Sequence, residues 1–272
     1  MLEAGARAPG APLTHLASPA WQHVNLCGIP FARATRSEVV AHLLSESERG
    51  RGGWIITANV DYLQRFATDP ETAAIYTKAN CIVADGVPLL WACKLLGNPL
   101  PDRVAGSDLV WLVAEGAARR GRSLYLLGGN AGAAEAAARI LGARWPDLRV
   151  AGFSSPNVSN PPTRAQVEAL RADIAACAPD VVYVAFGAPK EELVIEALHE
   201  SFPRTWWIGV GISLSFMSGE VRRAPIWMQS AGLEWLHRLV QEPRRLGPRY
   251  LSRNLPFVAK LLATSALSRL KR

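Results

Sequence analysis

The 272-residue chain is predicted to be an α/β protein with a Rossmann-like, doubly wound and mostly parallel sheet, followed by a C-terminal basic helical appendage. Two observations predict the sheet. Short apolar runs recur along the chain and end in glycine or a polar residue, and longer helical stretches separate them. Strands buried on both faces of a parallel sheet have continuous apolar sequences, and helices must connect them.

The elements follow in order along the chain. Six apolar runs are expected to be strands, at residues 54–59, 81–85, 123–128, 149–153, 181–186 and 206–210. Five helices are expected between them, at 69–79, 107–120, 131–144, 163–176 and 190–201. We expect three segments: a mobile leader at 1–20 that is rich in proline and small residues, a Rossmann-like body at 21–225, and an appendage at 226–272.

Composition excludes several classes of protein. With 49% hydrophobic and 19% charged residues, the chain is not disordered throughout. Its four cysteines have no CxxC spacing and are expected to be reduced thiols in a cytosolic protein. The sequence has no DxD pair and its five histidines have no ligand spacing, so neither a metal nor another cofactor is expected. No run approaches the roughly 18 apolar residues of a spanning helix, so membrane contact is expected to be peripheral.

Positive charge is concentrated at the C-terminal end. Residues 238–272 contain nine lysine or arginine residues and one acid, Glu242, which gives a net charge of +8. Since the whole chain carries +7, the preceding 237 residues are close to neutral. Charge clustered in this way predicts contact with an anionic surface or ligand. The arginines have no interleaved aromatic platform, so nucleic acid is not expected as a partner.

The segment 254–272 approximates an amphipathic helix. Its apolar stripe consists of Leu255, Val258, Leu262 and Leu270, with Phe257 and Leu261 beside it. Such a helix can lie on an anionic membrane surface, where apolar burial and about 1 kcal/mol per cation favour binding. The alternative is a helix that packs on its own domain and exposes its basic face to water.

Ligands of doubly wound sheets bind at the carboxyl ends of the strands, so glycines there are candidate site residues. Gly128 and Gly129 precede a helix, where free N–H groups and the helix dipole attract phosphate. A tight turn without a ligand is the alternative. Gly209 and Gly211 would allow the backbone to approach a sugar or base closely, and a buried turn is the alternative there.

Asp85 follows an apolar run and precedes a glycine, which places its carboxylate at the mouth of the sheet. Partial desolvation raises the pKa of such a group toward neutral pH, as a general base requires. The alternative is an aspartate that caps the next helix. Asp61 and Asp108 are further candidates, although Asp108 is also explained by the dipole of the helix that it begins.

Several short motifs occur in a characteristic order. They are DGVP at 85–88, RVAGSD at 103–108, LLGG at 126–129, GAPKEE at 187–192, RAP at 223–225, GLEWLHR at 232–238, EPRRL at 242–246 and RY at 249–250. Together they resemble the WecG/TagA/CpsF family of glycosyltransferases over about residues 25–256. The resemblance implies an inverting transfer from a UDP-sugar donor to a polyprenyl-diphosphate-linked saccharide acceptor. It also implies a peripheral protein on the cytoplasmic face of the inner membrane, in contact with the anionic membrane surface.

The resemblance also implies roles for particular residues. Asp85 would deprotonate the acceptor hydroxyl, while Thr57 and Asn59 would line the acceptor pocket. Arg103 would orient substrate or offset phosphate charge, and Lys190 is expected to contact substrate. The arginines expected to close over the diphosphates when the appendage docks at the membrane are Arg238, Arg244, Arg245 and Arg249. The oligomeric state is left open, a homo-oligomer included.

Two positions depart from the family pattern. Where many relatives read PKQE, this chain has Glu191, whose carboxylate only accepts hydrogen bonds and is expected to alter sugar choice or to share the role of base. Ser215 replaces the acid of the common GSFDF run. The donor hexose is therefore left open among glucose, N-acetylmannosamine and a uronic acid derivative, in exopolysaccharide or cell-surface polysaccharide biosynthesis. The alternative function is a membrane-recruited nucleotide-binding regulatory module, which would need the glycine turns but not Asp85.

Overall fold

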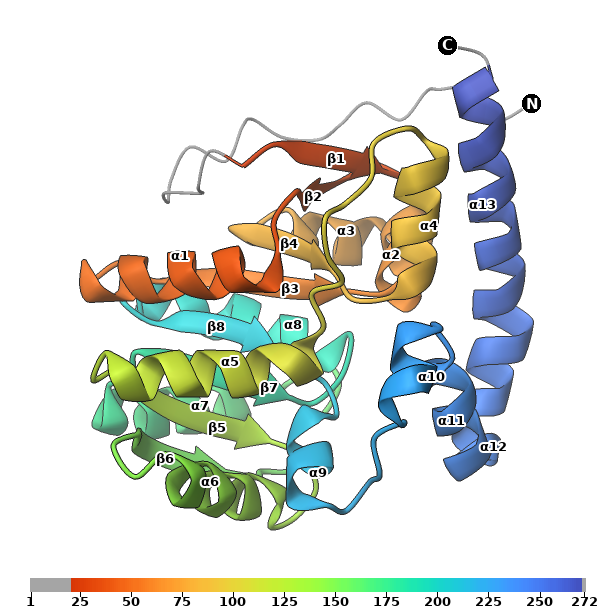
Figure 1. Ribbon diagram of the computed structural model, residues 1–272. Helices are drawn as coiled ribbons and strands as arrows, with labels where there is room; N and C mark the ends of the chain where they lie inside the picture. The colour runs from red at the N-terminus through yellow and green to blue at the C-terminus, as the bar shows by residue number, and fades with distance from the viewer. Residues whose placement is uncertain (1–20, 271–272) are drawn as a thin grey trace.

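The computed structural model describes residues 21–270, and the expected leader at residues 1–20 lies outside the described residues. The described chain has an α/β body with a helical C-terminal segment along one side of it (Figure 1). The predicted fold class is confirmed.

The centre of the body is a parallel sheet of six strands in the order β4-β3-β8-β7-β5-β6. Its strands are β3 (Gly53–Ala58), β4 (Cys81–Ala84), β5 (Ser123–Gly128), β6 (Arg149–Ser154), β7 (Val181–Ala185) and β8 (Trp206–Gly209). All six predicted strands are present, each within one residue of its predicted ends. The chain crosses from β4 at one edge to β5 in the other half of the sheet, and ligands of such sheets bind at the carboxyl ends of the strands near this change of direction.

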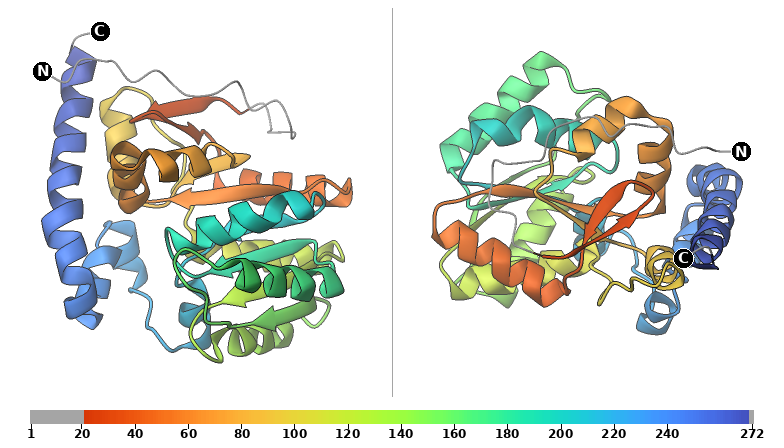
Figure 2. Two further views of the ribbon diagram at one scale, coloured as in Figure 1. Left: turned by 180° about the vertical axis from the view of Figure 1, so that it is seen from behind. Right: turned by 90° about the horizontal axis from the view of Figure 1, so that it is seen from above.

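Helices cover both faces of the sheet (Figures 1 and 2). One face is covered by α1 (Arg36–Glu48), α5 (Gly106–Arg119), α6 (Ala133–Arg144) and α9 (Ser213–Ser218). The other face is covered by α2 (Val60–Thr68), α3 (Pro70–Tyr76), α7 (Arg164–Cys177) and α8 (Lys190–Leu198), which a 3-10 turn at His199–Ser201 extends. Neighbouring side chains alternate between the two cores, since Trp54 and Ile56 pack on one face and Ile55 on the other. Burial on both faces therefore explains why the strands are apolar at every position.

Further elements were not among those predicted. An antiparallel hairpin of β1 (His23–Leu26) and β2 (Ile29–Ala32) lies next to β4. Its two-residue turn is formed by Cys27 and Gly28, with φ angles of 54° and 88°, and positive values at both positions suit the twist of a tight hairpin. The helix α4 (Val87–Leu95) follows β4 directly and buries Leu89.

The C-terminal segment consists of short helices and one long helix. They are α10 (Ile226–Ser230), α11 (Glu234–Gln241), α12 (Pro243–Gly247), a π-helical stretch η2 (Pro248–Asn254) and α13 (Leu255–Leu270). The helix α13 runs along the side of the body, next to α4 and α2 (Figures 1 and 2). Among residues 21–270, no helix has both the length and the apolar character of a transmembrane span.

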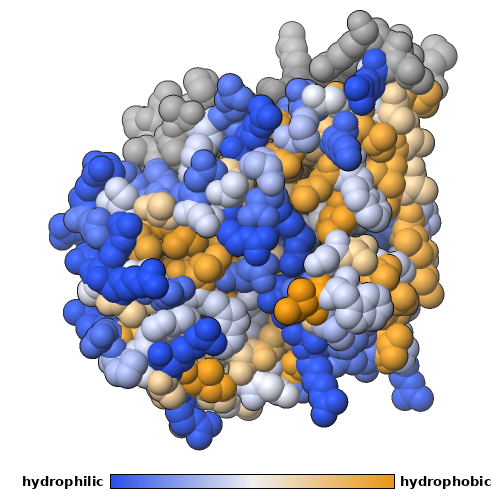
Figure 3. All heavy atoms as spheres, viewed as in Figure 1, coloured by the Kyte–Doolittle hydropathy of each residue, from blue (hydrophilic) through white to orange (hydrophobic). Residues whose placement is uncertain are grey.

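The apolar stripe of α13 is divided between the body and the surface. Leu261 is buried, and Phe257 and Leu262 pack against the core of the body. These residues follow the alternative in which the helix packs on its own domain. Leu255 and Leu267 remain 41% and 57% exposed, and apolar residues are visible along the edge that α13 forms (Figure 3).

Candidate functional site

A cavity of about 1020 Å³ lies at the carboxyl ends of the strands, between the body and the C-terminal segment. We refer to it as the sheet-end cavity. Residues that follow β3, β4, β7 and β8 line it on the body side, and residues of α11, α12, η2 and α13 line it on the other. Pockets for small ligands usually measure about 300–1,000 Å³, so the cavity has room for a large ligand or for two substrates.

Most of the residues singled out in the sequence lie together in this cavity. Those that line it are Thr57, Asn59, Asp85, Arg103, Gly129, Lys190, Glu191, Gly211, Arg238, Arg245 and Arg249. Gly128, Gly209 and Arg244 are not among the lining residues. Parallel strands end at the same edge of a sheet, and this brings segments that are far apart in the sequence together at the cavity.

Asp85 lies directly after β4, partly exposed to the cavity. Burial raises the pKa of Asp85 to about 7, and the positive charge of Arg103 opposes this rise. The carboxylate accepts a hydrogen bond of 3.4 Å from the N–H of Gly106, at the start of α5. It does not cap α4, whose N-cap residue is Gly86 without a side-chain hydrogen bond. Asp85 is thus a carboxyl group with little solvation, a pKa near neutral and access to a cavity.

Arg103 joins the body to the C-terminal segment. Its guanidinium contacts Asp108 of α5 at 3.3 Å and Glu234 of α11 at 3.0 Å. Arg223 contacts the same two carboxylates, at 2.7 Å and 3.2 Å. The positive charge of Arg103 is therefore largely compensated by carboxylates. Its ion pairs connect α5 of the body to α11 of the C-terminal segment, and its charge also acts on Asp85.

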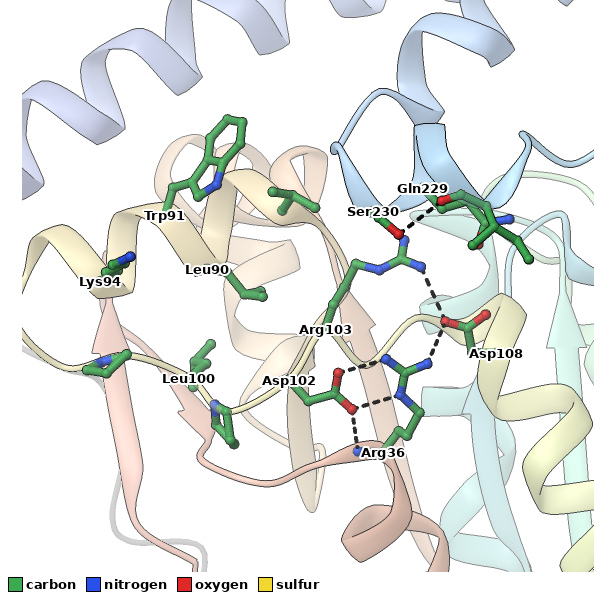
Figure 4. A pocket seen from close by; sticks show the side chains of 14 residues that line it. Arg36, Leu90, Trp91, Lys94, Leu100, Asp102, Arg103, Asp108, Gln229 and Ser230 are labelled. Atoms are coloured by element: carbon green, nitrogen blue, oxygen red, sulfur yellow. Dashed lines mark hydrogen bonds and ion pairs between the residues drawn. The ribbon is translucent and has the colours of Figure 1, made fainter.

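The ion pairs continue on the body side of Arg103 (Figure 4). Arg36 binds Asp102 through two contacts of 2.7 Å and lies 3.5 Å from Asp108. A smaller cavity of about 520 Å³ lies between α4 and α10, and these charged residues form part of its lining. It shares Val87, Trp91, Arg103 and Gln229 with the sheet-end cavity, so the two cavities are adjacent.

The turn after β5 has part of the geometry expected of a phosphate site. Gly128 has a φ of 99°, and a Cβ atom there would lie 2.9 Å from the carbonyl oxygen of Ala185, so glycine is required. The N–H of Gly129 is already bonded to that carbonyl at 2.8 Å. Within the described residues the N–H groups of Asn130 and Ala131 have no acceptor, and both residues line the cavity. The N–H donors without an acceptor at this turn thus belong to the two residues after the glycines.

Thr57 and Asn59 are held by local hydrogen bonds. The Thr57 hydroxyl donates to the carbonyl of Gly209 at 3.0 Å and ties the ends of β3 and β8 together. Asn59 is the N-cap residue of α2, and its side-chain oxygen accepts from the N–H of Asp61 at 2.9 Å. Lys190 at the start of α8 donates to the carbonyl of Val158 at 2.8 Å. Their positions at the cavity are therefore fixed by the ends of the elements that carry them.

Glu191 is buried against the ends of β7 and β8. One of its carboxyl oxygens accepts from the N–H groups of Gly187 and Gly211, both at 3.0 Å. Its other oxygen is 2.8 Å from the hydroxyl of Tyr62, which also contacts Glu192. A Cβ atom on Gly209 would lie 3.2 Å from the Glu191 carboxyl group, so this glycine makes space for Glu191.

The arginines of the C-terminal segment differ in their placement. Arg249 contacts Asp61 of α2 at 2.9 Å and Arg238 lies 3.5 Å from Glu242. Arg245 contacts Glu242 as well. Arg244 is exposed and lies outside the lining of the cavity. Three of the four predicted arginines therefore face the cavity from the side opposite the strand ends.

Some lining residues were not predicted from the sequence. They include Ser155, Asn157, Trp235 and Tyr250. Ser155 and Asn157 follow β6, which is a strand of the same parallel sheet. Residues that follow a predicted strand of this sheet could therefore have been identified as candidates. Within residues 21–270, no group of three or more His, Cys, Asp or Glu side chains is placed to hold a metal ion.

Comparison with known proteins gives matches that cover both the body and the C-terminal segment. A family model described as "Glycosyl transferase WecG/TagA/CpsF family" matches residues 24–271. The chain is 29% identical over 218 residues to an N-acetylglucosaminyldiphosphoundecaprenol N-acetyl-beta-D-mannosaminyltransferase of Bacillus spizizenii, with 80% of this chain and 82% of the relative covered. The protein of the same description from Bacillus subtilis is 28% identical over 218 residues, with 80% and 83% covered.

Proposed function

Because the chain belongs to the WecG/TagA/CpsF family of glycosyltransferases, we propose that it transfers a hexose from a UDP-sugar to a saccharide linked through diphosphate to a polyprenyl lipid. The names of the two relatives describe transfer of N-acetylmannosamine to N-acetylglucosaminyldiphosphoundecaprenol. The observation that carries the proposal is Asp85, whose carboxyl group has a pKa of about 7 and reaches a cavity with room for both substrates.

Asp85 is proposed to be the general base. Its carboxylate takes the proton of the acceptor hydroxyl, the oxygen forms a bond to C1 of the donor sugar, and the bond from C1 to the UDP oxygen breaks with inversion. A base with a pKa near the working pH is ionised often enough to accept the proton and basic enough to attract it. Arg103 holds the pKa of Asp85 in this range and fixes α11 against the body.

The leaving UDP carries negative charge that the protein must stabilise. Asn130 and Ala131, at the turn before α6, line the cavity, and their N–H groups, which have no acceptor among the described residues, suit a phosphate oxygen. Lys190 supplies a positive charge at the start of α8. The donor is therefore proposed to bind above β5 and β7, with its sugar directed toward Asp85.

The acceptor is proposed to bind between α2 and the C-terminal segment. Thr57 and Asn59 line this part of the cavity, and Arg238, Arg245 and Arg249 face it. One guanidinium group can donate two parallel hydrogen bonds to two oxygens of a phosphate group. These arginines therefore suit the diphosphate of a lipid-linked acceptor. Their present carboxylate partners, Glu242 and Asp61, would be exchanged for phosphate when the acceptor binds.

The exposed surface of the C-terminal segment is proposed to meet the membrane that holds this acceptor. Ile226, Trp227, Val240 and Leu251 are 80%, 65%, 74% and 54% exposed. Apolar side chains on the surface, together with a cluster of arginines and lysines, favour an anionic lipid surface. We propose a peripheral protein on the cytoplasmic face of the inner membrane, acting in exopolysaccharide or cell-surface polysaccharide assembly.

The identity of the donor is tested directly. A set of UDP-sugars that includes UDP-glucose, UDP-N-acetylmannosamine and UDP-linked uronic acids is screened for thermal protection of the protein. Each is then incubated with a short-chain lipid diphosphate N-acetylglucosamine, and products are identified by mass spectrometry. A product with one added hexose is expected. Binding of UDP-sugars without any product, across several lipid-linked acceptors, would favour a nucleotide-binding regulatory module instead.

A further inference from the structure

Two buried carboxyl groups share one hydroxyl group beside the sheet-end cavity. Glu191, Glu192 and Tyr62 are 3%, 2% and 3% exposed. The Tyr62 oxygen is 2.8 Å from a Glu191 carboxyl oxygen and also contacts a carboxyl oxygen of Glu192. Among the described residues, neither glutamate forms an ion pair with a lysine or arginine. Two negative charges would therefore repel each other in an environment that solvates neither.

Counting hydrogens decides the protonation of this group. A tyrosine hydroxyl has one hydrogen to donate, so it can satisfy one ionised carboxylate and not two. A second carboxyl group that carries a proton can donate it to the Tyr62 oxygen, which satisfies both contacts of the hydroxyl group. In this arrangement the three side chains carry two hydrogens: the hydroxyl hydrogen of Tyr62 and one proton on either Glu191 or Glu192.

The surrounding groups favour ionisation at Glu191, although burial raises the pKa of both glutamates. Glu191 accepts hydrogen bonds from Gly187, Gly211 and Tyr62, as a carboxylate does. The second oxygen of Glu192 is buried and has no hydrogen-bond partner among the described residues. Burial raises the pKa of Glu192 well above its usual value, and the charge of Glu191 raises it further.

Other charged and titratable groups near the pair are already engaged. On α2, Asp61 binds both Arg65 and Arg249 at 2.9 Å. On α3, the ring of Tyr76 lies 5.2 Å from that of Tyr62, and its buried hydroxyl has no partner among the described residues. The nearby cations are therefore paired with Asp61, and the neutral tyrosines offer no compensation for a second negative charge.

We propose that Glu191 is an ionised positioning residue and that Glu192 is held neutral, with Tyr62 donating to the first and accepting from the second. The Glu191 carboxylate then clamps the turns at Gly187 and Gly211, which line the cavity after β7 and β8. Both of its oxygens are occupied, so Glu191 supports the donor site and does not remove the acceptor proton. Only the effect on donor binding rests on the proposed function.

Infrared spectroscopy of the full-length protein tests the shared proton without any turnover. At neutral pH, a protonated carboxyl band that shifts on 13C-labelling of glutamate is expected in the wild type. The label separates it from Asp85. Glu192→Gln should lose the band, because it removes the proposed carrier of the proton, whereas Glu191→Gln should keep it, because burial alone raises the pKa of Glu192. Glu200→Gln, at an exposed position, should keep it. Absence of the band in the wild type, or its persistence in Glu192→Gln, would overturn the proposal.

Binding of UDP, measured by calorimetry, tests the positioning role. In Glu191→Gln the amide oxygen can accept from both glycines while the amide nitrogen donates to Tyr62, so the UDP Kd should stay within about threefold. Glu191→Leu leaves the partly buried N–H groups of Gly187 and Gly211 unpaired and should weaken UDP binding by about tenfold or more. Equal Kd values in the two variants would contradict a clamp. Loss of turnover in Glu191→Gln with UDP binding intact would identify Glu191 as a reacting group and overturn the assignment.

Discussion

Replacing Arg103 with glutamine is expected to move the acid limb of the pH–rate profile to higher pH. Burial raises the pKa of Asp85 to about 7, and the positive charge of Arg103 is the largest influence that lowers it. Removing this charge favours the protonated carboxyl group. It also leaves Glu234 and Asp108, which both raise the pKa of Asp85, without one of their cations.

The magnitude follows from the fraction of Asp85 that is ionised. With a pKa of about 7, half of the carboxyl groups can act as a base at pH 7. An opposite charge nearby shifts a pKa by about 1–3 units, and a rise of about one unit would leave roughly one-tenth ionised at that pH. The value of kcat/KM at pH 7 should therefore fall about fivefold. The loss should disappear near pH 9, where about all of the carboxyl groups are ionised in both proteins.

The assay measures kcat/KM between about pH 6 and 9 with a soluble acceptor. Arg103→Lys keeps the positive charge and should retain most of the wild-type profile. Arg36→Gln is the matched control, because it removes a cation that also contacts Asp108 but leaves Arg103 in place. A loss in Arg103→Gln that is equal at every pH would refute the reasoning, since it would show that Arg103 acts by contacting substrate and not through Asp85.

Two further predictions concern the C-terminal segment. Arg249→Gln should raise the KM for a diphosphate-linked acceptor by about tenfold, which is the effect of one lost charge-assisted hydrogen bond. Arg244 lies outside the cavity, so Arg244→Gln should change this KM by less than about twofold. Equal effects of the two variants in steady-state kinetics would contradict a specific role for Arg249. Leu261→Ala should lower the free energy of unfolding by about 2–5 kcal/mol because this side chain is buried, whereas Leu267→Ala at an exposed position should change it by less than about 0.5 kcal/mol. Denaturant titrations measure both values, and equal changes would show that α13 does not stabilise the body.

The strands could be predicted because burial on both faces leaves a continuous apolar signal. Helices with a mixed surface could not. In α1, Glu46 and Ser47 are buried, and Glu46 is bonded to Arg49 and Arg51, so the buried face of this helix is not uniformly apolar. In α4 the sequence is mostly apolar and follows directly after a strand, without the polar face that marks an amphipathic helix.

The site was predictable where a residue ends a strand and not where it depends on packing between distant segments. Asp85 and Asn59 follow apolar runs, so the topology of the sheet brings them together. The pairing of Arg103 with Glu234 joins residues 131 positions apart and depends on how α11 docks on the body. The contact of Tyr62 with Glu191 likewise requires α2 and α8 to pack side by side. Local sequence patterns contain no information about such contacts.

The most direct test of the proposed chemistry is the turnover of Asp85→Asn, measured together with its affinity for UDP. Asparagine has nearly the same shape as aspartate but cannot take the proton from the hydroxyl group of the acceptor saccharide. We expect turnover to fall by about 10²–10⁴-fold while the Kd for UDP stays within about threefold, because the donor diphosphate is proposed to bind at other residues. Turnover near the wild-type value, with a donor and acceptor that the wild type uses, would contradict the role of Asp85 as the base.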